Sequence, residues 1–310
     1  MKKPIIIDTD PGKDDAIALA MALYSEDIDI KLITTVAGNV SLKKVSYNAL
    51  RLLKYLERED IPIAMGACRP LINPYKDRFN EDASSIHGES GLGDFEFEEP
   101  EKEPLEINAI DAMREVILES EVKVTILALG PLTNLAILFK AFPEVKENIE
   151  EIIFMGGSIN RGNLGVMTEF NIGTDPEAAK IVIDSGLKVT MVGLDIGNKA
   201  RIFLKDLEEL KDYNKSTRLT YSLFKDYKGM DKESAIKVYD STAIAYLLKP
   251  DIFKLEYTYV DVELRGQYTL GCTIVDLDNR LEEKPNIYVC TDIDEDEFRK
   301  YFLDSLKNCI

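Results

Sequence analysis

The sequence predicts an α/β fold with a mostly parallel sheet that helices cover on both faces. Short apolar runs rich in β-branched residues alternate along the chain with longer stretches of helical periodicity, and this alternation is typical of βαβ units. Parallel sheets built from such units are buried on both sides. No internal repeat or low-complexity linker divides the 310 residues. We therefore expect one domain, residues 1–310, that carries helical insertions.

The predicted elements follow one another in a regular order. Apolar runs predict strands at residues 4–7, 30–36, 61–65, 122–129, 152–155 and 187–194. Periodic stretches between most of them predict helices at residues 16–24, 41–57, 109–120 and 176–185. Ser41 is suited to an N-cap, Pro176 to a first helical turn, and Gly186 to the end of a helix. These boundary signals agree with the periodicity.

The last third of the chain changes in character. Residues 205–237 are charged and rich in tyrosine, with a predicted helix near residues 217–226. This segment is either a lid over a site or a helical excursion on the surface. Beyond it, residues 256–263, 273–275 and 286–290 predict three more strands, and a closing helix is expected from Asp294.

Composition excludes several classes of function. The formal net charge is −18, so the summed field repels phosphates and disfavours nonspecific binding to nucleic acid or anionic membranes. The N-terminus lacks the apolar core of a signal peptide, and the longest uncharged run, residues 124–139, is shorter than a membrane span. Four cysteines have no metal-binding or redox spacing. These features predict a soluble, cytoplasmic protein.

An unusual concentration of acidic residues follows the first predicted strand. Asp8, Asp10, Asp14 and Asp15 lie within eight positions, at the carboxyl end of a strand, where open α/β sheets bind ligands. Two of them could cap the next helix, and Asp8 could hold the turn. A divalent cation best offsets the repulsion among four carboxylates, and oxygen ligands favour calcium or magnesium over zinc.

Polar residues also follow later strands. Asn163, Glu169 and Asn171 lie in a glycine-containing loop and offer hydrogen-bond donors and acceptors suited to sugar hydroxyls, or they cap their own backbone. The single histidine, His87, lies in a glycine-rich stretch and is either a proton shuttle or a structural residue. Asp240 opens a predicted helix as an N-cap or as a functional carboxylate.

Taken together, these motifs resemble those of the inosine-uridine preferring nucleoside hydrolases over nearly the whole chain. The matching segments are DTDPGKDDA from residue 8, GN at 38–39, HGESGLG at 87–93, LGPLTNLA at 129–136, MGG at 155–157, TEFNIGTDPEAA at 168–179, and Asp240. The resemblance implies a Rossmann-like open sheet and calcium-dependent hydrolysis of the N-glycosidic bond of ribonucleosides to ribose and free base. It also implies a homo-oligomer, dimer or tetramer, that acts on small-molecule nucleosides in purine or pyrimidine salvage.

The resemblance also implies a role for each matching residue. The calcium ligands are Asp10, Asp15, Asp240 and the main-chain carbonyl of Leu129. Asp10 would also be the general base that deprotonates the metal-bound water. The residues expected to contact the substrate are Asp14, Asn39, Met155, Asn163, Glu169, Phe170 and Asn171, with Met155 beneath the sugar. His87 would close over the base from its loop.

The departure from the family pattern that matters most is at residue 239. Family members that accept inosine usually have a histidine immediately before the metal-binding aspartate, where it protonates the departing base, and this chain has Tyr239. A phenol, with an ordinary pKa of about 10, is a weak proton donor at neutral pH, but it can hydrogen-bond or stack on a base.

Two alternatives differ from a hydrolase of this family. One is a nucleoside or ribose binding protein with weak or no turnover, which Tyr239 makes conceivable. The other is a haloacid-dehalogenase-like phosphohydrolase, because Asp8-Thr9-Asp10 matches its D-x-D motif. That motif normally continues with Gly-Thr, whereas here Pro11-Gly12 follows.

Overall fold

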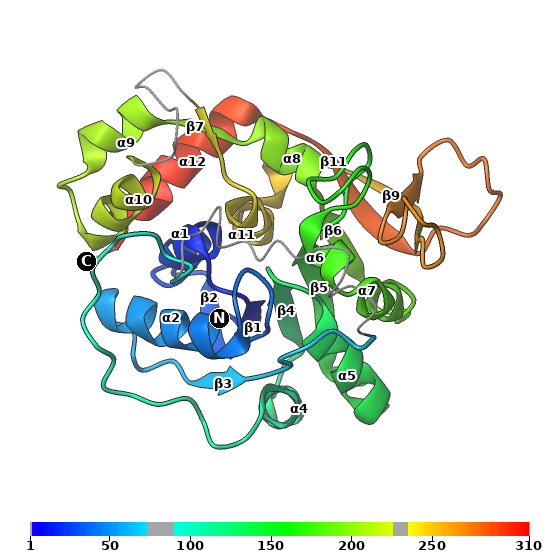
Figure 1. Ribbon diagram of the computed structural model, residues 1–310, viewed down its shortest axis with the longest axis horizontal. Coiled ribbons are helices and arrows are strands. Elements are labelled where there is room, and N and C mark those ends of the chain that lie inside the picture. The colour runs from blue at the N-terminus through cyan, green and yellow to red at the C-terminus, as the bar shows by residue number, and fades with distance from the viewer. Residues whose placement is uncertain (1, 73–89, 226–234, 310) are drawn as a thin grey trace.

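A nine-stranded sheet forms the centre of the computed structural model, which describes residues 2–72, 90–225 and 235–309 (Figure 1). Its strand order is β10-β9-β11-β6-β5-β4-β1-β2-β3. The strands are β1 (Lys3–Thr9), β2 (Ile28–Thr35), β3 (Ile63–Met65), β4 (Val124–Ala128), β5 (Ile149–Met155), β6 (Val189–Val192), β9 (Phe253–Val262), β10 (Thr273–Asp276) and β11 (Ile287–Ile293). A separate ribbon pairs β7 (Arg201–Phe203) with β8 (Ala235–Lys237).

The strand order reverses between β1 and β4. From β1 the chain moves outward through β2 to β3, whereas from β4 it moves the other way through β5 to β6, and all these neighbours are parallel. β11 continues the parallel run beside β6, and β9 and β10 add antiparallel strands at that edge. The crevice at such a reversal is the usual ligand site of open α/β sheets.

Helices cover both faces of the sheet, as the apolar strands require. Side chains of β1 show the division, because Ile5 and Ile7 belong to one buried cluster and Ile6 to the other. The first cluster includes α1 (Lys13–Ala22), α2 (Leu42–Tyr55), α10 (Lys215–Lys225), α11 (Asp240–Leu248) and α12 (Glu295–Lys307). The second includes α4 (Ala109–Glu119), α5 (Thr133–Ala141) and α7 (Pro176–Ile183). The mostly parallel sheet between helical layers confirms the predicted fold class.

Most predicted element boundaries agree with the structure. Pro176 is the first residue of α7, and Gly186 follows that helix with a φ of +76°, which favours glycine. Ser41 precedes α2, but its side chain makes no capping hydrogen bond. The sequence interpretation missed α5, because residues 132–139 carry no charge and so lack the charged face that marks an amphipathic helix. It also missed α6 (Phe170–Thr174), α8 (Leu194–Lys199) and α9 (Leu204–Leu210).

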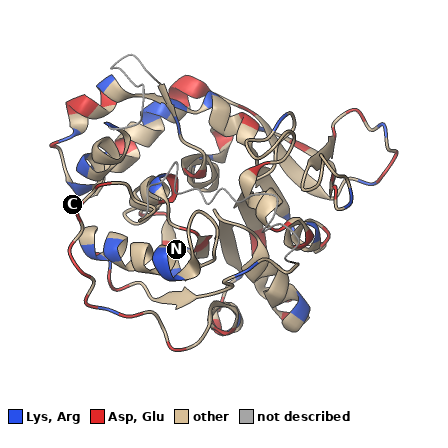
Figure 2. Cartoon of the chain, in the orientation of Figure 1, with Lys and Arg blue, Asp and Glu red and all other residues tan. Residues whose placement is uncertain are grey.

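The charged segment at residues 205–237 contains packed helices in its described part. α10 confirms the helix predicted near residues 217–226, and Leu207, Leu219 and Phe224 are buried between this segment and the core. Residues 226–234 lie outside the described ranges. Charged residues of both signs lie mainly on outer helices and loops, while the central strands carry few (Figure 2). Among the described helices, none is long and apolar enough to cross a membrane.

Candidate active site

The acidic turn lies where the strand order reverses. Asp10 follows β1 and is almost completely buried. Its Oδ2 accepts a hydrogen bond from the backbone N–H of Asn39 at 2.6 Å, and its carbonyl accepts one from Asn39 Nδ2 at 3.0 Å. The backbone N–H of Leu129, just after β4, donates to the carbonyl of Asp8 at 2.7 Å. The ends of β1, β2 and β4 therefore meet at Asp10.

The Asp15 carboxylate accepts hydrogen bonds that hold the loop before α1. Its Oδ1 accepts from Thr9 Oγ1 at 2.5 Å, and its Oδ2 accepts from the Gly12 N–H at 3.1 Å and from Asn39 Nδ2 at 3.1 Å. A carboxylate in the first turn satisfies N–H groups that have no partner within the helix. The helix-capping alternative is thus correct for Asp15. With the bond from the Asp10 N–H to Oδ1, its two oxygens accept four hydrogen bonds.

Asp14 connects the acidic turn to a distant helix. Its Oδ2 accepts hydrogen bonds from the backbone N–H groups of Tyr239 at 2.7 Å and Asp240 at 3.3 Å, at the start of α11. Its Oδ1 is buried and has no hydrogen-bond partner among the described residues. Asp240 is the first residue of α11 and Tyr239 is its N-cap, so the alternative that Asp240 only caps this helix is wrong.

Burial and mutual repulsion make these carboxylates reluctant to ionise. Burial raises the pKa of Asp14 to about 7, with the nearby Asp15 charge adding to the effect. The pKa values of Asp10 and Asp240 are raised well above the usual range, first by burial and then by the Asp15 charge. Burying several carboxylates side by side costs folding free energy. Such clusters are therefore typical of functional sites and not of a purely structural core.

The chemistry of these donors suits a hard cation. Four carboxylates, among them Asp14 with its unpartnered Oδ1, and a main-chain carbonyl supply only oxygen, which calcium and magnesium prefer. Within the described residues, no three acidic, histidine or cysteine side chains form a ready metal-ligand cluster. Asp10 Oδ2 and both Asp15 oxygens instead accept hydrogen bonds from backbone N–H groups.

A second polar group lies beside the first, at the ends of β4 and β5. The Nδ2 of Asn171 donates to the carbonyl of Leu129 at 2.7 Å and to that of Met155 at 3.0 Å. Glu169 is the N-cap of α6, and its carboxylate accepts from the N–H groups of Gly157, Asn171 and Ile172 at 2.9, 2.9 and 3.1 Å. The structure thus brings Leu129, Met155, Glu169 and Asn171 together.

Other predicted residues are less central. Asn163 is exposed, and its Oδ1 accepts from the Phe170 N–H at 2.9 Å, so its local role is to hold the loop. His87 lies outside the described residues. Tyr239 is half-buried, its hydroxyl donates to Asn198 Oδ1 at 3.5 Å, and a Cβ on Gly197 would lie 2.1 Å from its ring. Gly197 and Asn198 of α8 therefore define where the phenol lies.

The chain matches a known protein family over most of its length. The model of the inosine-uridine preferring nucleoside hydrolases matches residues 5–300. The chain belongs to this family. The resemblance found in the motifs is therefore confirmed, and the phosphohydrolase interpretation of Asp8-Thr9-Asp10 is wrong. Its family membership identifies the chain as an enzyme of the nucleoside hydrolase class.

Curated relatives and solved structures agree with this family. The non-specific ribonucleoside hydrolase RihC of Klebsiella pneumoniae is 42% identical over 301 residues, 97% of each chain. The same-named protein of Salmonella paratyphi B is 43% identical over 297 residues, 96% of this chain and 95% of the relative. A plant nucleoside hydrolase, PpNRh1, has a TM-score of 0.89 at 31% identity over 99% of both chains. An inosine-guanosine nucleoside hydrolase has a TM-score of 0.90 at 27% identity over the full length of both.

Sequence reasoning missed residues that support this nucleoside hydrolase site. Thr34 and Asn134 donate to the buried Asp8 carboxylate, and Asn198 accepts from Tyr239 and, at 2.7 Å, from Lys237 Nζ. Asn134 lies inside the LGPLTNLA segment, which was a usable signal. Thr34 stands in an apolar strand and Asn198 in an unassigned stretch, so neither had a local signal.

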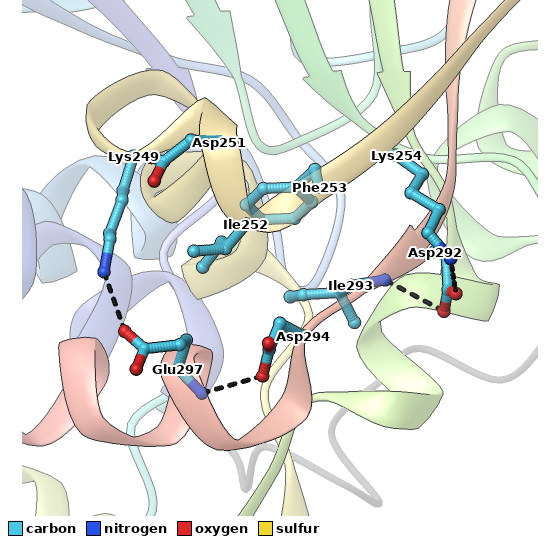
Figure 3. Close-up of a pocket in the computed structure, with 9 residues that line it drawn as sticks. All are labelled: Lys249, Asp251, Ile252, Phe253, Lys254, Asp292, Ile293, Asp294 and Glu297. Atoms are coloured by element: carbon cyan, nitrogen blue, oxygen red, sulfur yellow. Dashed lines mark hydrogen bonds and ion pairs between the residues drawn. The ribbon is translucent and has the colours of Figure 1, made fainter.

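A separate hollow of about 490 Å³ lies where α11, β9, β11 and α12 meet (Figure 3). None of the predicted nucleoside hydrolase site residues lines it. Its charged side chains pair with one another, Lys249 with Glu297 and Lys254 with Asp292. This hollow therefore has the character of a solvated surface recess between paired charges.

Proposed function

We propose that this chain hydrolyses the N-glycosidic bond of ribonucleosides to ribose and free base, with calcium as its metal. The observation that carries the proposal is that Asp10, Asp14 and Asp15 meet Asp240, more than 220 residues later in the sequence, at the strand-order reversal. The family and the names of its ribonucleoside hydrolase relatives support the same substrate class.

The acidic character of the site matches the charge that this reaction develops. Cleavage of an N-glycosidic bond builds positive charge on the ribose ring in the transition state. Carboxylates that lie near the ring stabilise that charge more than they stabilise the neutral nucleoside, and this difference lowers the barrier. Burial strengthens the effect because little water screens the interaction.

Calcium would be held by Asp10, Asp15, Asp240 and the carbonyl of Leu129. A bound calcium ion would lower the pKa of a water molecule and orient it for attack. Asp10 would take the proton from that water, since its carboxylate is buried and fixed by Asn39. The remaining contacts to ribose are assigned to Asp14, Asn39, Met155, Asn163, Glu169, Phe170 and Asn171.

The departing base needs a proton or a hydrogen bond. We assign this role to the hydroxyl of Tyr239, which lies beside the acidic turn. The backbone N–H of Tyr239 donates to Asp14, and its ring packs against Gly197. His87, which belongs to the HGESGLG motif, is the second candidate. We assign base contact to both, with Tyr239 adjacent to the carboxylates.

A panel of ribonucleosides tests the proposal. Purified protein is stripped with EDTA, divided, and assayed for reducing sugar on inosine, uridine, cytidine and adenosine with and without added calcium. Release of ribose that depends on calcium is the expected result. No release from any nucleoside in either state would sink the hydrolase proposal, and tight ribose binding measured calorimetrically without turnover would establish the binding-protein alternative.

We also propose that the chain is a cytoplasmic homo-oligomer, either a dimer or a tetramer. The family resemblance is the support for this assignment. Light scattering coupled to size-exclusion chromatography measures the mass directly, and a mass equal to one 34.9 kDa chain would contradict it.

A further inference from the structure

A buried polar network lies at the end of β1, two residues before Asp10. The Asp8 side chain is completely buried, and its Oδ1 accepts from Thr34 Oγ1 at 2.6 Å and from Asn134 Nδ2 at 2.7 Å. Asp8 Oδ2 has no partner among the described residues.

Asn134 joins the ends of three strands from helix α5. Besides Asp8 of β1, its Nδ2 donates to the carbonyl of Thr35 at the end of β2, at 3.1 Å. Its Oδ1 accepts from the Ala67 N–H just beyond β3, at 2.7 Å. A Cβ on Gly66 would lie 2.2 Å from this Oδ1, so the backbone there approaches the carboxamide closely.

The network fixes the strand end that carries the active-site groups. The Asp8 carbonyl accepts from the Leu129 N–H at 2.7 Å, which sets the register of β1 against β4 immediately before Asp10 and Gly130. A Cβ on Gly130 would lie 2.7 Å from Asp10 Oδ1. A small shift of β1 against β4 would therefore change how Asp10 lies relative to the Leu129 carbonyl.

Stability alone does not account for this network. A carboxyl group that is fully buried with one oxygen unpartnered costs free energy, and an apolar side chain of similar size would avoid that cost. The surrounding strand residues Ile6 and Leu32 are apolar and completely or almost completely buried. A polar network among these apolar residues is better explained if it fixes the position of the neighbouring Asp10.

We propose that Thr34 and Asn134 are positioning residues that act through Asp8 to hold the end of β1, and with it Asp10, in the geometry that hydrolysis requires. This inference rests on the proposed function. Residues that orient a metal ligand from behind typically change metal affinity or activity by about 10- to 100-fold when they are removed. We expect an effect of that size here.

The test compares two matched threonine substitutions. Thr34→Val removes one hydroxyl that donates to Asp8. Thr190→Val is the control, because Thr190 in β6 is equally buried and its hydroxyl donates to Glu151 at 2.7 Å. For Thr34→Val we expect kcat to fall at least about tenfold with KM changed little, and calcium affinity measured by calorimetry to fall by a similar factor. Thr34→Ser should restore both values, and Thr190→Val should keep both.

Thermal unfolding of each variant separates positioning from a loss of fold. Asn134→Ala, which removes the other donor to Asp8, gives the same readouts if Thr34→Val does not fold. Wild-type kcat and calcium affinity in folded Thr34→Val and Asn134→Ala would overturn the inference. If the wild-type protein releases no ribose, the proposed function fails, while the calcium affinities of the variants still decide the inference.

Discussion

Two glycines leave the space that the Asp10 carboxylate occupies. A Cβ on Gly38 would lie 2.1 Å from Asp10 Oδ2, and a Cβ on Gly130 would lie 2.7 Å from Oδ1. Neither glycine has a positive φ, so the backbone itself would accept alanine at both positions. Glycine is needed there because of the carboxylate and not because of the chain conformation.

Gly130→Ala should therefore impair catalysis without unfolding the protein. The new methyl group would push Asp10 from its place, and a displacement of about 1 Å can cost about 100-fold in rate. Steady-state assays should show kcat reduced by about that factor, and circular dichroism should show the wild-type spectrum. A variant with unchanged kcat would show that the Asp10 position is not critical.

Tyr239 is the residue to which we assign contact with the departing base. An imidazole has an ordinary pKa of about 6.5 and donates a proton at neutral pH far more readily than a phenol. Tyr239→His should therefore raise kcat/KM for inosine by about tenfold or more, relative to uridine. Tyr239→Phe keeps the ring against Gly197 and is the control, with no gain expected. No change for either nucleoside in the histidine variant would contradict the leaving-group argument.

At the scale of elements, an ion-pair network joins α8, β9 and β11. Lys199 Nζ and Lys254 Nζ donate to the two Asp292 oxygens at 2.6 and 3.0 Å. The hydrogen bonds from these two lysines lower the pKa of Asp292 below its usual range. The three elements share this contact at the antiparallel edge of the sheet.

Asp292→Asn should lower stability by at most about 1 kcal/mol at pH 7, because its side chain is 38% exposed and water screens both ion pairs. Since the folded-state pKa is lowered, the stabilisation is present above the ordinary carboxyl pKa of about 4 and is lost as the pH falls toward the folded-state value. Urea unfolding of both proteins at pH 7 and at pH 3 measures this difference. Asp278→Asn, which removes a carboxylate paired with the exposed Arg280, is the control. A difference that grows at low pH would refute the assignment.

Elements with strong local signals were predictable from the sequence. The strands β1, β2, β4, β5 and β6 and the helices α1, α2, α4 and α7 all have an apolar period or a boundary residue in the chain itself. The short α6 and α8 have neither, because they are set by tertiary contacts such as the Glu169 cap and the packing of Gly197 on Tyr239.

The site was predictable as a set of strand ends and less so as a set of contacts. Asp10, Asp15 and Asn39 lie together as the strand-end rule requires. No sequence pattern indicates that Asp14 accepts hydrogen bonds from the start of α11, since that contact depends on how α1 and α11 pack. Thr34 and Asn198 were missed because their contacts, with Asp8 and Tyr239, also depend on tertiary packing.

For the whole molecule, calcium should act as a stabilising ligand. The protein has a formal net charge of −18 and concentrates buried carboxylates at one site, so a bound cation offsets repulsion in the folded state only. At a concentration 100 times its Kd, a ligand adds about 2.7 kcal/mol. The Tm should then rise by about 5 °C between EDTA and excess calcium.

Differential scanning calorimetry measures this shift. Asp240→Asn removes one carboxylate and should reduce the response to calcium, while Thr190→Val should keep it. Equal Tm values for wild-type protein in EDTA and in calcium would exclude a calcium site of useful affinity.

The bond between Asp14 and the start of α11 joins residues 225 positions apart. During synthesis at about 5–20 residues per second, the acidic turn emerges about 10 to 45 s before the helix that completes it. A chain released before residue 240 would lack Asp240 together with β9, β10 and β11, so the site is incomplete until synthesis is nearly finished.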